Sequence, residues 1–317
     1  MQKTVLLTGA FGYIGKYVIT KLLNENYHII ALSRSSHIVP ATLKAHLDII
    51  QVDIADENMI SNVLSKVKQC DSLIHLAANL DMVGNDKTIS VNCMGTYHLI
   101  RLASQLGVKK FIYISSIPVI GIPQQIPITE NHPVHPESLY HITKYMGEQM
   151  ICSLCPSIMK KTILRIPSPI GIGMSPNNYL SILFQKCLRS ETINVYGQGL
   201  RTQNYIDVRD VAEAIYHALI YPNSGLFLIA GEKSITNKDL AFLCQKITHS
   251  SSKITFGQKT DPEEGNQWTI STKKAANELN FFPKYSLVDT LSWIYDTISS
   301  DKKSLIYTRT NNGSENI

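Results

Sequence analysis

A glycine-rich segment near the start of the chain constrains the fold more strongly than any other feature of the sequence. It lies between an apolar run typical of a strand, residues 4–9, and a segment with the apolar spacing of a helix, residues 13–25. Glycines at such a junction allow a tight turn and let the backbone approach a pyrophosphate, which then rests on the helix N-terminus. A second strand-like run at residues 28–33 supplies the strand–helix–strand context that makes the pattern specific. We therefore expect a dinucleotide-binding turn that contains Gly9, Gly12 and Gly15.

The first half of the chain alternates short apolar strand runs with helical patterns. Continuous Ile, Val and Leu strands that alternate with helices are typical of a parallel sheet covered on both faces. The sequence therefore predicts an α/β fold with a doubly wound parallel sheet. The expected strands are residues 4–9, 28–33, 47–53, 72–78, 110–116 and 161–166, and the expected helices are 57–68, 87–106 and 137–152.

The second half of the chain is less regular. Residues 168–179 are rich in Pro, Gly, Ser and Asn and are expected to form a loop. We expect residues 1–166 to form the dinucleotide-binding domain, with parts of 190–230 returning to it, and residues 167–300 to form mainly a smaller, mixed α/β substrate lobe. Residues 301–317 are polar and are expected to be a flexible tail. Further helices are expected at 179–189, 208–220, 236–247, 271–279 and 287–299, with short strands in INVYG and GLFLIA.

Composition excludes several classes of protein. The 317 residues are 44% hydrophobic and 17% charged, which is ordinary for a globular chain. The net charge of +5 is spread out, with no basic run to indicate a nucleic-acid or membrane partner. No apolar stretch approaches the roughly 20 residues that span a bilayer. The six cysteines are scattered, and the one C-x-x-C pair, Cys152 and Cys155, has no second pair to complete a metal site. We therefore expect a cytoplasmic protein without a metal.

The end of the second strand indicates which dinucleotide is bound. An acidic residue normally follows this strand and binds the adenosine ribose of NAD, whereas this chain has Ser33 and Arg34 there. The loss of a carboxylate removes repulsion against a ribose phosphate, and an arginine can bind that phosphate through two hydrogen bonds. The expected cofactor is therefore NADP(H), with NAD(H) as the alternative if Arg34 is only an exposed surface residue.

A tyrosine and a lysine four residues apart mark the expected catalytic site. Tyr140 and Lys144 fall on one face of a predicted helix. The pKa of a free tyrosine is about 10, and a neighbouring ammonium group is expected to lower the pKa of Tyr140 so that it exchanges protons with a carbonyl or hydroxyl group. Lys144 could also hydrogen-bond the nicotinamide ribose. Ser115 and Ser116 end a buried strand, where a serine hydroxyl could orient a substrate oxygen.

Together these motifs resemble the extended short-chain dehydrogenases/reductases, in the group that contains the NAD-dependent epimerases and dehydratases of sugar nucleotides. The resemblance covers about residues 3–298. It implies a Rossmann-type domain with a C-terminal substrate lobe, and a homodimer formed through helices that include the one carrying Tyr140. The segments that carry the resemblance are TGAFGYIG, VDIAD, HLAA, VNCMGTYHL, ISSIPVIG, Tyr140-x-x-x-Lys144, LRIPSPIGIG, YIDVRDVAEAI and STKKAANELNFFPKYSLVDTL.

The resemblance also implies roles for individual residues. It implies that Ser116 orients the substrate and that Tyr140 and Lys144 complete the catalytic set. It places Asp53 near the adenine and implies that Asn92 supports the active-site helix. The residues expected to form the cofactor site are Gly9, Phe11, Gly12, Tyr13, Ile14, Gly15, Ser33, Arg34, Ser35, Asp53, Ile54, Leu76, Ala77, Ala78, Asn92, Tyr140, Lys144 and Pro167.

Departures from the family pattern bear on the reaction. Family dehydratases carry an Asp-Glu pair directly after the orienting hydroxyl, where this chain has Ile117 and Pro118, so dehydration is not expected. Family members that bind a nucleotide diphosphate often have an arginine where this chain has Gln203, with Arg201 two residues upstream. A family asparagine is replaced by Ser168. The residues expected to contact the substrate are Ser116, Ser168, Arg201 and Gln203.

These observations favour a NAD(P)-dependent oxidoreductase that uses NADPH to reduce a keto sugar linked to a nucleotide. The missing acid after the second strand favours a cofactor that is bound, used and released. Three alternatives remain open: an epimerase that holds NAD tightly, a reductase of a carbonyl compound without a nucleotide, and a non-catalytic NADP(H)-binding sensor. The expected partners are a small-molecule substrate and a second copy of the chain.

Overall fold

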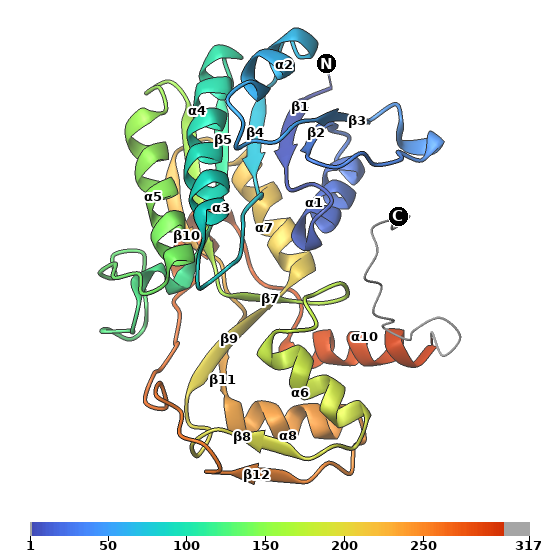
Figure 1. Cartoon of the computed structure of the whole chain (residues 1–317), viewed down its shortest axis with the longest axis vertical. Coiled ribbons are helices and arrows are strands. Elements are labelled where there is room, and N and C mark those ends of the chain that lie inside the picture. Colours follow the sequence, from blue (N-terminus) through green and yellow to red (C-terminus); the bar gives the residue numbers. More distant parts are fainter. Residues whose placement is uncertain (1, 301–317) are drawn as a thin grey trace.

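A seven-stranded parallel sheet forms the centre of the larger part of the molecule (Figure 1). The computed structural model describes residues 2–300. The strands of this sheet are β1 Thr4–Thr8, β2 His28–Ser33, β3 Leu47–Gln51, β4 Ser72–His75, β5 Lys110–Ser116, β6 Lys160–Ile166 and β10 Gly225–Leu228. Their order is β10-β6-β5-β4-β1-β2-β3, and the order reverses between β1 and β4 as in a doubly wound sheet. The predicted Rossmann-type α/β fold is therefore confirmed.

Helices cover both faces of this sheet. They are α1 Tyr13–Asn24 and α7 Val208–Ile220 on one face, and α2 Met59–Lys66, α4 Gly95–Gln105 and α5 Leu139–Leu154 on the other. Neighbouring residues of β1 point to opposite faces: Val5 and Leu7 pack in the core under α1 and α7, whereas Leu6 packs under α2, α4 and α5. Both faces of β1 are therefore apolar, which explains its continuous apolar run in the sequence.

The helix expected at residues 87–106 is interrupted. The structure has a short helix α3 Asp86–Ile89, a π-helical turn at Ser90–Met94, and then α4. The buried Asn92 lies in this turn, and its side chain bonds to groups outside the helix. The expected helical segment is therefore present, but apolar spacing did not reveal the π turn within it, a feature that is frequent at functional sites.

The smaller lobe contains two small sheets and three helices below the large sheet in Figure 1. Its core lies between the helices and the strands of these sheets. The loop expected at residues 168–179 was wrong in its first residues, because Ser168–Ile170 pair with Tyr205–Asp207, part of a strand 37 residues further along the chain that had not been expected. The elements are β7 Ser168–Ile170, β9 Thr202–Asp207 and β11 Ser234–Thr236 in one sheet, β8 Ile193–Val195 and β12 Ile254–Phe256 in the other, and α6 Tyr179–Leu188, α8 Asn237–Ile247 and α10 Leu287–Ser300.

The chain returns from the smaller lobe to the large sheet. α7 packs against α1, and β10, the GLFLIA run, pairs with β6 as the outermost strand. α9 Lys273–Leu279 also contributes apolar residues to the core under α1 and α7. The tail expected at 301–317 lies outside the described residues. Within residues 2–300, no helix has the length and apolar character needed to cross a membrane.

Candidate active site

The carboxyl ends of β1, β2, β4, β5 and β6 open into one cleft of about 920 Å³, which extends to β7 and β9 of the smaller lobe. Ligands of open α/β sheets bind at this edge, where the strand order reverses. All residues predicted for the cofactor or substrate line this cleft except Asn92. Those that line it are Gly9, Phe11, Gly12, Tyr13, Ile14, Gly15, Ser33, Arg34, Ser35, Asp53, Ile54, Leu76, Ala77, Ala78, Ser116, Tyr140, Lys144, Pro167, Ser168, Arg201 and Gln203.

The glycine turn between β1 and α1 is closely packed. Gly9 has a φ of +67°, and a side chain there would also meet the backbone nitrogen of Ala77. A Cβ on Gly15 would clash with the carbonyl oxygen of Gly9, so the helix packs directly on the turn. Gly12 is the N-cap of α1, and no side chain caps this helix. The N-terminus of α1 therefore faces the cleft with backbone N–H groups available to an anion.

The end of β2 forms one wall of the part of the cleft that is expected to hold the dinucleotide. The Ser33 hydroxyl accepts a hydrogen bond of 3.3 Å from the Ser35 backbone N–H and lies 3.1 Å from Nε2 of His37. The His37 ring stacks on Phe11 with centroids 3.8 Å apart. Arg34 is exposed and borders the cleft. The sequence analysis missed His37, because its place depends on how the loop after β2 folds back.

A buried hydrogen-bond chain fixes the floor of the cleft between β1 and β4. Nδ1 of His75 lies 2.8 Å from the Thr8 hydroxyl, and Nε2 lies 2.9 Å from the Thr96 hydroxyl on α4. The Thr8 hydroxyl also accepts the backbone N–H of Ala77 at 3.2 Å. Burial, with a smaller contribution from Lys144, holds the pKa of His75 well below its usual range. The neutral ring thus ties together the segments that carry the cleft residues.

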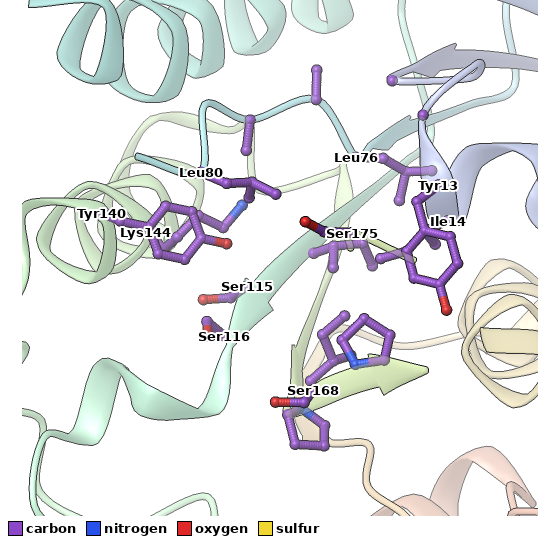
Figure 2. Close-up of a pocket in the computed structure, with 18 of the residues that line it drawn as sticks. Tyr13, Ile14, Leu76, Leu80, Ser115, Ser116, Tyr140, Lys144, Ser168 and Ser175 are labelled. Carbon is purple, nitrogen blue, oxygen red and sulfur yellow. The ribbon is translucent and has the colours of Figure 1, made fainter. Parts of the chain in front are cut away.

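Tyr140 and Lys144 extend from α5 into the same part of the cleft (Figure 2). Lys144 is 3% exposed, and its ammonium lies 4.1 Å from the centre of the Tyr113 ring. Burial lowers the pKa of Lys144 to about 7, while Glu148 raises it. Burial also raises the pKa of Tyr140 to about 12. The expected lowering of the Tyr140 pKa was therefore wrong for the cleft as formed by the protein alone, because both groups lose water there.

The two serines at the end of β5 have different surroundings. The Ser115 hydroxyl donates a hydrogen bond of 2.5 Å to the Glu148 carboxylate. Glu148 also forms a bidentate ion pair with Arg165 of β6, with N–O distances of 2.9 and 2.7 Å. Glu148 and Arg165 are buried and join α5 to the sheet. Ser115 lines the cleft, but it is only 2% exposed and its hydroxyl is already bonded to Glu148. Ser116 is the next residue along the strand and borders the cleft (Figure 2). Its hydroxyl is therefore better placed than that of Ser115 to meet a substrate.

Asn92 does not line the cleft but holds two segments that do. Its Oδ1 accepts the Asn79 backbone N–H at 2.7 Å. Its Nδ2 donates to the Asn79 carbonyl at 3.0 Å and to the Thr143 hydroxyl at 2.9 Å. Thr143 precedes Lys144 on α5. The side chain therefore connects the π turn, the segment after β4 and the helix that carries the tyrosine and lysine.

Charged and amide side chains form the substrate end of the cleft. Arg201 precedes β9 and contacts two carboxylates, with 2.8 Å from Nη1 to Glu263 and 3.3 Å from Nε to Asp261. Gln203 donates to the Asn237 side chain at 2.8 Å and accepts from the Tyr205 hydroxyl at 3.1 Å. The sequence analysis missed both carboxylates, because they lie about sixty residues from Arg201 in an irregular segment.

The cysteine pair does not contribute to this cleft. Cys152 is exposed and Cys155 is buried near the end of α5, and both are free thiols. Across residues 2–300, no three His, Cys, Asp or Glu side chains gather as a metal site would require.

Comparisons with known proteins agree with this geometry. The model of the NAD dependent epimerase/dehydratase family matches residues 5–229. The chain belongs to this family. It is 31% identical to the UDP-glucose 4-epimerase of Drosophila melanogaster over 254 residues, 68% of this chain and 72% of that protein. It is 27% identical to the UDP-glucose 4-epimerase of Halalkalibacterium halodurans, over 90% of this chain and 92% of that protein.

A solved structure is similar over almost the whole chain. The UDP-glucose 4-epimerase of Thermotoga maritima, crystallised with UDP-glucose, superposes with a TM-score of 0.84 at 25% identity. The match covers 94% of this chain and 99% of that one. The similarity therefore includes the smaller lobe and is not confined to the dinucleotide-binding sheet.

Proposed function

We propose that this protein is a nucleotide-sugar epimerase that uses a nicotinamide dinucleotide. The observation that carries the proposal is that Ser116, Tyr140 and Lys144 border the same cleft as the glycine turn of α1. Groups suited to move a proton and orient a sugar oxygen therefore lie at the same edge of the sheet as a turn suited to a dinucleotide. The sequence analysis placed a keto-sugar reductase first, but the curated relatives described above are epimerases. We therefore place the epimerase first and the reductase second.

The residues of the cleft fit a dinucleotide. The N-terminus of α1 has no side-chain cap, and Gly12 leaves the backbone open to a phosphate group. Asp53 and Ile54 lie at the end of the cleft expected for the adenine, and Ala77 and Ala78 line its floor. The bound group supplies the acceptor and donor of hydride and, when oxidised, a positive charge.

The proposed reaction oxidises one sugar carbon and reduces it again from the opposite face. Tyr140 takes the proton from the sugar hydroxyl in the first half and returns it in the second, while the hydride leaves and returns to the same carbon. Burial alone raises the pKa of Tyr140 to about 12. Protonated Lys144, together with the positive charge of the oxidised dinucleotide when it is bound, would stabilise the phenolate form of Tyr140. Ser116 donates a hydrogen bond to the sugar oxygen. Proton and hydride are both returned, so the net reaction changes only stereochemistry.

Dehydration is disfavoured by the wall that follows Ser116. Ile117 and Pro118 begin a 3₁₀ turn, Ile117–Ile120, and neither side chain can donate or accept a proton. Elimination of water requires an acid and a base next to the reacting carbons. This part of the cleft supplies neither.

Cofactor content and exchange test the proposal. The purified protein is denatured and the released dinucleotide identified, and UDP-glucose is then incubated with native protein without added cofactor. We expect a dinucleotide that does not exchange and the formation of UDP-galactose. An empty site that binds NADPH much more tightly than NADH, without interconversion of sugars, would contradict the epimerase and favour the reductase. Arg34, exposed at the end of β2, is the observation that favours this second candidate.

We also propose that two copies associate through α4 and α5. These helices lie side by side on one face of the sheet (Figure 1). They expose large apolar side chains, among them Tyr97, Ile142 and Met146, which are 36%, 46% and 48% exposed. Light scattering after size exclusion should give the mass of a dimer. Ile142→Glu combined with Met146→Glu should give a monomer, whereas Ile158→Glu, at another exposed site, should not.

A further inference from the structure

Arg201 is the one cation at the substrate end of the cleft. Among the described residues that line it, only Arg34, Lys144 and Arg201 are lysine or arginine. Arg34 lies at the end of β2, in the dinucleotide half, and Lys144 lies beside Tyr140. An anionic part of a substrate that extends away from Tyr140 into the smaller lobe would therefore meet Arg201.

The two carboxylates on Arg201 differ in position. The Asp261 side chain is 6% exposed and does not line the cleft. The Glu263 side chain is 51% exposed and lines the cleft. Asp261 therefore holds the guanidinium from behind, whereas Glu263 covers the side that faces a ligand. With both in place the group of three carries a net negative charge, which repels an anion.

The backbone that carries Glu263 is held firmly, so its side chain can move alone. The Glu264 carboxylate accepts backbone N–H groups of Gln198 and Leu200, at 2.6 and 3.1 Å. The Asn266 carbonyl accepts the Thr202 backbone N–H at 3.1 Å. These bonds tie the segment to the start of β9. A half-exposed glutamate on such a support can leave Arg201 by a side-chain rotation.

We propose that Glu263 occupies the place on Arg201 that the diphosphate of the substrate takes, and that it sets the affinity for that diphosphate by competing with it. Carboxylate and phosphate oxygens bind a guanidinium group with the same geometry, so one can replace the other. Asp261 keeps Arg201 oriented during the exchange. The inference rests on the proposed function, because it assumes a substrate with a nucleoside diphosphate.

Calorimetric titration with UDP tests this exchange on the dinucleotide-loaded protein. Glu263→Gln keeps the shape of the side chain and removes its charge, so UDP should bind about fivefold more tightly than to the wild type. Uridine, which has no phosphate, should bind both proteins equally. Glu57→Gln is the matched control, because it removes the same charge from a surface ion pair with Arg101 outside the cleft. It should leave UDP affinity unchanged.

A second variant shows whether the tighter UDP binding of Glu263→Gln depends on Arg201. Arg201→Gln should weaken UDP binding, and adding Glu263→Gln to it should then give a smaller gain than in the presence of Arg201, because only the repulsion between the Glu263 carboxylate and the phosphates is removed. Equal UDP affinity for the wild type and Glu263→Gln would overturn the competition, and so would a gain that is equally large without Arg201. If neither protein binds UDP, GDP, dTDP or CDP, both the competition and the nucleotide-sugar function fail. Binding of UDP with no difference between the two proteins removes only the competition.

Discussion

The two ends of the cleft are formed by different parts of the polypeptide, one mainly by backbone and the other mainly by side chains. The dinucleotide end is shaped by the main chain, through the left-handed Gly9 and the contact of Gly15 with the turn. The substrate end is shaped by side chains that neutralise one another, as Arg201 does with Asp261 and Glu263. A site formed by the main chain follows from local spacing in the sequence. A site formed by side-chain pairs depends on which distant segments meet, so the two ends should also respond differently to substitution.

The largest expected effect is on the rate of sugar interconversion and comes from Tyr140, which lies where the two ends of the cleft meet. Tyr140→Phe removes the only group proposed to move the proton, so the rate of sugar interconversion should fall about 10³-fold. The phenyl ring preserves the packing, and dinucleotide binding should change less than about twofold. Turnover with UDP-glucose and fluorescence titration with the dinucleotide measure the two effects. Retained turnover would exclude Tyr140 as the acid–base group.

The dinucleotide end of the cleft should not tolerate a side chain at Gly15, where the backbone of the turn is closest. Gly15→Ala places a Cβ against the Gly9 carbonyl oxygen, and backbone must move to relieve the clash. We expect dinucleotide affinity to fall about a hundredfold, with a lower melting temperature, because the α1 N-terminus shifts from its place. Gly265→Ala is the control, since a Cβ there meets nothing within 4 Å. Equal losses in both variants would contradict the special role of the turn.

A third effect tests whether burial lowers the pKa of Lys144. Burial lowers the pKa of Lys144 to about 7. Between about pH 7 and its ordinary pKa near 10.5, the unfolded chain holds a proton that the folded chain lacks. The free energy of unfolding should therefore rise with pH in this window, by up to about 1.4 kcal/mol per pH unit.

Urea unfolding of the dinucleotide-free protein at several pH values measures this rise. Lys144→Met removes one titrating group and should abolish the rise between about pH 7 and 8, while Lys44→Met, at an exposed site, should keep it. Above about pH 8 part of the rise should remain in Lys144→Met, because burial also lowers the pKa of Lys110 to about 8. A wild-type curve parallel to that of Lys144→Met would show that the ammonium keeps its ordinary pKa.

The sequence predicted the dinucleotide end in more detail than the substrate end, for a physical reason. The position of Tyr140 opposite the glycine turn follows from strand and helix order, which apolar periodicity reveals. The π turn at Asn92 shifts that periodicity by only about one residue and was missed. The raised pKa of Tyr140 depends on how completely the finished cleft excludes water, which spacing does not report. The acids on Arg201 come from a segment without periodicity, so no local pattern marks them.

The smallest effect tests whether Arg34, an exposed side chain at the dinucleotide end, makes the protein bind NADPH in preference to NADH. Arg34→Ala should weaken NADPH binding about fivefold and leave NADH binding unchanged, because an exposed charge pair contributes little and only NADPH carries the ribose phosphate. Lys44→Ala, which removes the same charge outside the cleft, should change neither affinity. Unchanged NADPH affinity in Arg34→Ala would show that Arg34 is a surface residue, and would leave the main chain and the Ser33 hydroxyl to bind either dinucleotide. The dinucleotide end would then contain no cation that selects between the two dinucleotides, and recognition of phosphate by a charged side chain would be confined to the substrate end of the cleft.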